Sequence, residues 1–108
     1  MTTPIIIQSS FPITFECTDI CTTLIHSKLA ACIHKTSPIT SFYSWENELC
    51  SDNEYLLLIK TTLDHFDAIS KLLNERHPYE VPEIIQLPIN TMTESYLNWF
   101  QSAIHNCL

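Results

Sequence analysis

The sequence of 108 residues contains no glycine. An average chain of this length would hold about seven. Glycine is needed in phosphate-binding P-loops, in dinucleotide-binding fingerprints and in the nucleophile elbow of hydrolases. The sequence therefore excludes these three kinds of site, and with them the commonest nucleotide-binding and hydrolase functions.

Basic residues are also scarce. Five Lys and Arg stand against twelve Asp and Glu, which gives a formal net charge of −7. A nucleic-acid-binding protein needs a basic patch that neutralises phosphates, and the chain has no basic run. The same negative charge would repel anionic membranes and attract cations. We therefore expect neither nucleic acid nor membrane as a partner.

Long hydrophobic runs are absent as well. Wholly apolar stretches such as Leu56–Ile59 are far shorter than a membrane-spanning helix requires. No positively charged segment precedes Ile5–Ile7, as a signal peptide would require, and Pro4 comes almost at once. We expect a cytoplasmic protein. Its five cysteines are expected to be reduced thiols packed as small hydrophobic side chains: Cys17, Cys21, Cys32, Cys50 and Cys107.

Charged residues make up only 16% of the chain and apolar residues 45%. The length predicts a single domain over residues 1–108. A domain this small has a thin core, and with so few charges part of its surface must be apolar. These two properties together predict an oligomer.

The order of hydrophobic patterns predicts an α+β fold. Strands are expected at Ile5–Ser10, Ala30–Lys35, Ile39–Glu46, Glu54–Thr61 and Glu83–Ile89, with a bend at Ser37–Pro38 and a turn at Asn47. Helices are expected over Ile13–Lys28, from a Thr61–Asp64 capping box to His77, and from a Thr91–Glu94 capping box to the end. This order is that of a ferredoxin-like βαββαβ sandwich with an added C-terminal helix.

Three of the predicted strands are apolar at successive positions: Ile5–Ile7, Leu56–Ile59 and Ile84–Ile85. A sheet with one wet face would alternate apolar and polar residues instead. The two crossover helices of this fold cover only one face. Partner subunits are therefore expected to cover much of the other.

The segment His77–Pro88, HPYEVPEIIQLP, carries the most specific local pattern. Pro78 and Pro82 make it a rigid connector. It holds an imidazole, a phenol and two carboxylates within seven residues, and these groups bind metals or form hydrogen bonds. The alternative is a rigid loop that packs Tyr79 against a neighbour.

The chain resembles the CutA family of divalent-cation tolerance proteins over nearly its whole length. The resemblance is carried by HPYEVPEII at 77–85, LAAC at 29–32, TSFYSWE at 40–46, LIKT at 58–61 and YLNW at 96–99. It implies a ferredoxin-like fold similar to the signalling protein PII, assembled as a homotrimer. It also implies a link to copper or other divalent ions, and no enzymatic activity is expected.

The resemblance extends only partly to the metal ligands. Some bacterial members have a cysteine three residues before the proline that precedes the first helix, and a His-His pair before the Pro-Tyr motif. This chain has Ser9 and Arg76-His77 at those positions. His77, Cys32 and Glu83 are therefore the predicted metal ligands, although a buried cysteine such as Cys32 more often packs in the core.

Aromatic residues are enriched at interfaces. Tyr43, Trp45, Tyr79 and Pro82 are the predicted contacts between subunits of the trimer. Cys17 and Cys21 lie four residues apart on one predicted helix face, where they could bind a soft ion or pack in the core. The alternative function is a PII-like sensor or scaffold that binds a small ligand or a protein at subunit clefts without metal.

Overall fold

The computed structural model describes residues 3–104. In chain order the elements are β1 (Pro4–Pro12), α1 (Thr18–His26), β2 (Cys32–Lys35), β3 (Ile39–Trp45), β4 (Glu48–Thr62), the 3₁₀ turn η1 (Leu63–His65), α2 (Phe66–Arg76), β5 (Ile85–Pro88) and α3 (Glu94–Ile104). The five strands form one antiparallel sheet in the order β2-β4-β1-β5. Strand β3 continues from β2 after the bend at Pro38 and pairs with the first half of β4. The ferredoxin-like prediction is confirmed.

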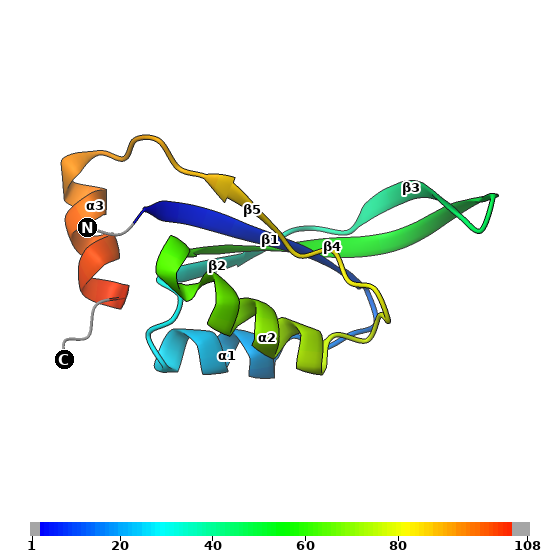
Figure 1. Cartoon of the computed structure of the whole chain (residues 1–108), viewed down its shortest axis with the longest axis horizontal. Coiled ribbons are helices and arrows are strands. Elements are labelled where there is room, and N and C mark those ends of the chain that lie inside the picture. The colour runs from blue at the N-terminus through cyan, green and yellow to red at the C-terminus, as the bar shows by residue number, and fades with distance from the viewer. Residues whose placement is uncertain (1–2, 105–108) are drawn as a thin grey trace.

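The helices cover the two faces of the sheet unequally (Figure 1). Helices α1 and α2 cover one of them (Figure 1), and apolar residues at alternate strand positions are fully buried there, including Ile5, Ile7, Leu57 and Ile59. This alternation follows from the two-residue period of a strand.

Helix α3 packs across one end of the sheet rather than over a face (Figure 1). Phe100 and Ile104 on this helix form a small second core with Ala31. Much of the sheet face opposite α1 and α2 is therefore open. Ile6, Leu56 and Leu58 on it are only half-buried, while Ile85 and Leu87 are exposed. The prediction that both faces of the sheet are apolar is confirmed.

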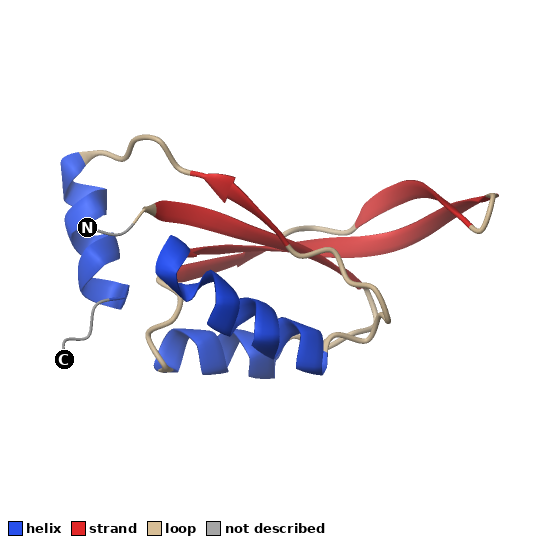
Figure 2. Ribbon diagram, in the orientation of Figure 1, coloured by secondary structure: helices blue, strands red, loops and turns tan. Residues whose placement is uncertain are grey.

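The paired strands β3 and β4 extend beyond the helices as a long hairpin (Figure 2). A two-residue turn joins them, and both of its residues, Glu46 and Asn47, have positive φ. This is the turn that matches the twist of a hairpin, and it normally prefers glycine. The predicted turn at Asn47 is confirmed.

The predicted helix over Ile13–Lys28 begins too early. The chain turns at Ile13 and Thr14, and α1 begins only at Thr18. Pro12, expected near the helix start, is instead the last residue of β1, since it pairs with Glu54. Ile13 and Cys17 fit the apolar period of the helix, although both lie before its first residue.

Both predicted capping boxes are also displaced. The Thr61 hydroxyl donates a hydrogen bond to the backbone oxygen of Leu29, 2.6 Å away, so it does not cap a helix. The η1 turn separates Thr61 from α2. At the last helix the first residue is Glu94 rather than a residue next to Thr91. In addition, β4 begins earlier than predicted, and β5 is limited to four residues.

Candidate functional site at the base of the hairpin

The connector between α2 and β5 brings the most specific residues of the sequence to the hairpin. Helix α2 ends at Arg76, and His77 has an extended backbone with φ −70° and ψ 139°. Proline at 78 requires this, because it disfavours a helical conformation in the residue before it. From His77 to Ile84 the connector has no regular structure.

His77 is buried and both of its ring nitrogens are hydrogen-bonded. Nδ1 accepts the backbone N–H of Tyr79 at 3.1 Å, so the proton lies on Nε2, which donates to the backbone oxygen of Ser10 at 2.8 Å. The ring stacks on Phe11, with centroids 4.2 Å apart. Burial lowers the pKa of His77, although the Ser10 hydrogen bond and nearby Glu54 act in the opposite direction. In this arrangement neither nitrogen offers a free lone pair to a metal.

Glu54 is the carboxylate that joins the connector to the hairpin. It is only 6% exposed. Its two oxygens accept hydrogen bonds from the hydroxyls of Tyr79 and Ser41, each 2.6 Å long. Burial, and next the hydrogen bond to Glu54, raise the pKa of Tyr79. The phenol therefore stays protonated and donates to the carboxylate.

A cavity of about 610 Å³ opens beside this network. Its walls combine aromatic rings with carboxylates: Ser10, Ser41, Phe42, Tyr43, Trp45, Cys50, Glu54, Tyr79, Glu80, Val81 and Glu83. The Tyr43 hydroxyl donates to Asp52, and this bond raises the pKa of Tyr43 to about 12. The walls suit an apolar partner that also carries a few donor groups.

Three of the four residues predicted at subunit contacts line this cavity, namely Tyr43, Trp45 and Tyr79. Trp45 is 51% exposed and Tyr43 is 40% exposed. Pro82 is half-buried in the connector. The structure thus brings most of the predicted interface residues together on one surface.

The predicted metal ligands are not brought together. Glu83 accepts a hydrogen bond from Nε2 of Gln8 at 2.8 Å, and Cys32 lies on β2, where its sulfur is 3.6 Å from Nε2 of His34. Within residues 3–104, no three or more His, Cys, Asp or Glu side chains form a group able to hold a metal ion.

At Ser9 and Arg76, the positions where the resemblance would place further ligands, this chain has no thiol or imidazole. Ser9 is fully buried, and Nη1 of Arg76 donates to the hydroxyl of Thr23 at 3.4 Å.

Cys17 is the N-cap residue of α1, and its sulfur lies 4.0 Å from that of Cys21 on the helix. Cys17 belongs to the buried core, and Cys21 packs against it. Burial, and next the neighbouring Cys17, raise the pKa of Cys21 to about 11. A thiol that stays protonated is a poor metal ligand, so the pair fits the core interpretation. The four cysteines within residues 3–104 are all free thiols, and Cys107 lies outside the described residues.

Two residues of this region were missed by reading the sequence. Glu54 and His34 lie within predicted strands, and the sequence assigns neither of them to a site. The chain around Glu54 gives no local signal, since its partners Ser41 and Tyr79 lie 13 and 25 residues away. For His34 a signal was present, because alternate residues of a strand share a face and Cys32 is two positions away.

Among residues 3–104 no helix is long and apolar enough to cross a membrane.

The chain is similar to known proteins over most of its length. It is 41% identical over 78 residues to a divalent-cation tolerance protein CutA of Thermus thermophilus, covering 72% of this chain and 76% of that protein. It is 39% identical over 83 residues to a chloroplastic CutA of Arabidopsis thaliana, covering 77% of this chain but only 46% of the plant protein. The match thus spans about half the length of the plant relative.

A solved structure agrees with the sequence matches. The crystal structure of CutA1 from Oryza sativa superposes with a TM-score of 0.88 at 33% identity, over 98% of this chain and 97% of that one. The sequence profile described as CutA1 divalent ion tolerance protein matches residues 5–103. The chain therefore belongs to the CutA1 divalent ion tolerance family.

Proposed function

We propose that the protein is a homotrimeric divalent-cation tolerance protein that binds copper or another divalent metal ion and has no enzymatic activity. The observation that carries the proposal is the apolar surface of the hairpin, where Phe42 is 71% exposed and Trp45 51%. Monomeric proteins seldom expose contiguous apolar patches of this kind. The open sheet face beside it adds Ile85 and Leu87.

In the proposed trimer, a neighbouring subunit would bind at the cavity beside Glu54. Aromatic anchors in such pockets contribute most to the stability of protein interfaces. Tyr43, Trp45, Tyr79 and Pro82 are the contacts we assign to it. Light scattering at micromolar concentration tests the assembly, and a mass corresponding to a monomer would exclude the trimer.

The metal function is supported by the net charge of −7, which concentrates cations at the surface. The ligands we propose are His77 and Glu83 in the connector and Cys32 on β2. His77 can coordinate a metal only if it releases the Ser10 carbonyl or the Tyr79 N–H. Cys32 and Glu83 need further donors from water or from another subunit, because zinc and copper sites use three or four ligands.

Titration of Cu(I), Cu(II) and Zn(II) into the reduced protein tests the metal function. If His77→Ala leaves the affinity unchanged, His77 is not a ligand. Tyr79→Ala should weaken assembly more than it weakens metal binding, because Tyr79 lines the cavity and holds Glu54. The reverse order would contradict its assignment to the interface.

We place this activity in the cytoplasm, where reduced thiols persist. The free state of Cys17, Cys21, Cys32 and Cys50 is consistent with that compartment. Fractionation of the source cells, followed by detection with a specific antibody, tests the location.

A further inference from the structure

We propose that Cys32 and His34 together form the protein's half of a tetrahedral metal site for a borderline divalent ion of the Zn²⁺ class. The inference deepens the metal-binding function proposed above and rests on it. It assigns that function to a pair of residues on β2.

The two side chains lie on one face of the sheet. Residues two apart on a strand point to the same side, and Cys32 Sγ is 3.6 Å from Nε2 of His34. A thiolate at about 2.3 Å and an imidazole at about 2.05 Å from Zn²⁺ would be separated by about 3.6 Å at the tetrahedral angle. The observed separation therefore already matches the chelating geometry.

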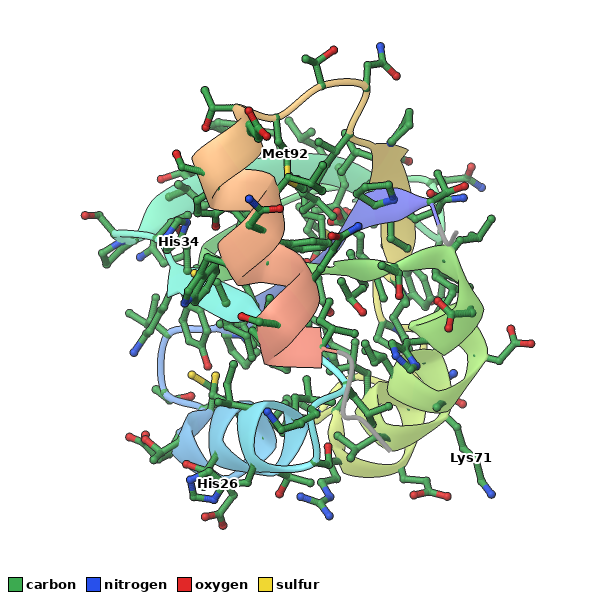
Figure 3. The ribbon with its side chains drawn as sticks, turned by 90° about the vertical axis from the view of Figure 1, so that its left-hand side faces the viewer. His26, His34, Lys71 and Met92 are labelled. Carbon is green, nitrogen blue, oxygen red and sulfur yellow. The ribbon has the colours of Figure 1, made fainter. Side chains whose placement is uncertain are left out.

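The pair is held by regular structure. Cys32 is paired with Lys60 and His34 with Leu58 on β4. A ligand pair carried by a strand is held more precisely than one carried by a loop. Figure 3 shows His34 apart from His26 on α1 and Lys71 on α2.

Within a single chain the pair is open to solvent, and it lies on the sheet face that partner subunits would cover in the proposed trimer. Cys32 is half-buried and His34 is exposed, and in the described sheet β2 is an outer strand with only β4 beside it. Two coordination positions would remain for water or for donors from a second copy.

The Lys60 ammonium does not occupy the site. Its Nζ lies 3.3 Å from the hydroxyl of Tyr96 and 5.3 Å from the centre of that ring. The ammonium is thereby directed toward α3. The simplest competing interpretation of the Cys32–His34 pair is a weak thiol hydrogen bond to the imidazole.

Cobalt titration distinguishes the two interpretations. Co²⁺ replaces Zn²⁺ in tetrahedral sites, and a cobalt–thiolate bond absorbs in the near ultraviolet. The reduced full-length protein should bind one Co²⁺ per chain with this absorption, and Zn²⁺ should displace it. Cys32→Ser should abolish the absorption. His34→Asn should weaken affinity at least about tenfold, since even loss of an outer-shell partner costs about that much.

The matched controls are Cys21→Ser and His26→Asn, which remove a thiol and an imidazole elsewhere and should change neither quantity. Thiolate absorption that persists in Cys32→Ser, or an unchanged affinity in His34→Asn, would overturn the assignment. If His77→Ala alone lowers the affinity, the proposed metal function stands and this site is wrong. If the wild-type protein binds neither Co²⁺, Zn²⁺ nor copper, both proposals fail.

Discussion

At the scale of single residues, the most specific motif of the chain is used for internal hydrogen bonding. His77 bridges the end of β1 and the connector, while Tyr79 and Ser41 satisfy the buried carboxylate of Glu54. Buried polar groups are stable only when their hydrogen bonds are complete. The motif therefore holds the connector against the hairpin through hydrogen bonds.

Tyr79→Phe removes one of the two donors to Glu54 while keeping the ring. We expect the free energy of unfolding to fall by about 1–3 kcal/mol, because a buried charged acceptor loses a partner. Urea unfolding followed by circular dichroism measures the change. The matched control is Tyr43→Phe, whose hydroxyl bonds Asp52 at an exposed position and should matter by less than about 0.5 kcal/mol. Equal effects of the two substitutions would contradict the role of Glu54.

His77 should make the protein less stable in mild acid. Its folded-state pKa is lowered by burial, so below about pH 6.5 the unfolded chain binds a proton more readily than the folded one. The stabilisation is complete above the unfolded pKa and is lost as the pH falls toward the folded pKa. We expect the difference in unfolding free energy between wild type and His77→Gln to shrink over that range.

Urea unfolding of both proteins at several pH values measures this difference. A difference that stays constant or grows as the pH falls would show that His77 is not held neutral.

At the scale of elements, the chain forms tight turns without glycine. Lys28 follows the end of α1 with φ 62°, and Glu46 and Asn47 form the hairpin turn with φ 51° and 67°. A left-handed backbone costs about 1–2 kcal/mol for most residues with a side chain. Tertiary contacts must offset this cost at the non-Asn positions.

Lys28→Gly should therefore stabilise the protein. Lys28 is exposed and lies just after the C-cap Ser27, at the position where glycine is preferred. Relief of the left-handed strain should exceed the entropy that glycine gains in the unfolded chain, for a net gain of about 0.5–1 kcal/mol. Thermal unfolding measures the gain. Lys28→Ala is the control, since it removes the same charge but keeps the strain. A gain in the alanine variant as well would point to charge instead.

At the scale of the whole molecule, the hairpin exposes large apolar side chains to solvent in one chain. It extends beyond the helices (Figure 2), and Leu49 near its tip is 81% exposed. An isolated two-stranded hairpin is marginally stable in water. Its length and its aromatic residues are best explained by contact with another subunit.

Trp45→Ala should therefore weaken assembly without unfolding the chain. Half of this side chain is exposed within one subunit, so its loss costs little there, whereas interface aromatics commonly contribute 2 kcal/mol or more, by rough estimate. Sedimentation velocity should show a lower mass at equal concentration, with an unchanged circular dichroism spectrum. Leu63→Ala, also an exposed apolar position, is the control. An unchanged mass for Trp45→Ala would remove the hairpin from the proposed interface.

The elements of the fold could be predicted where local patterns were strong. The strand around Leu57 and Ile59, the end of α2 before Pro78 and the turn at Asn47 follow from hydrophobic period, proline geometry and turn preference. The start of α1 could not be predicted, because Ile13 and Cys17 continue the apolar period of the helix into the preceding loop. The displaced cap at Thr61 has another cause, since its hydroxyl bonds Leu29, which lies 32 residues away.

The candidate site, like the fold, could be predicted from the sequence only in part. The sequence by itself determined the family, the order of the elements, the rigid connector and the absence of glycine-dependent chemistry, because these depend on neighbouring residues. Only the tertiary structure decided that His77 is satisfied by Ser10, that Glu54 is buried under Tyr79, and that Cys32 and His34 stand at a chelating distance. Those relations depend on strand register and on side-chain contacts between distant parts of the chain, which no local pattern encodes.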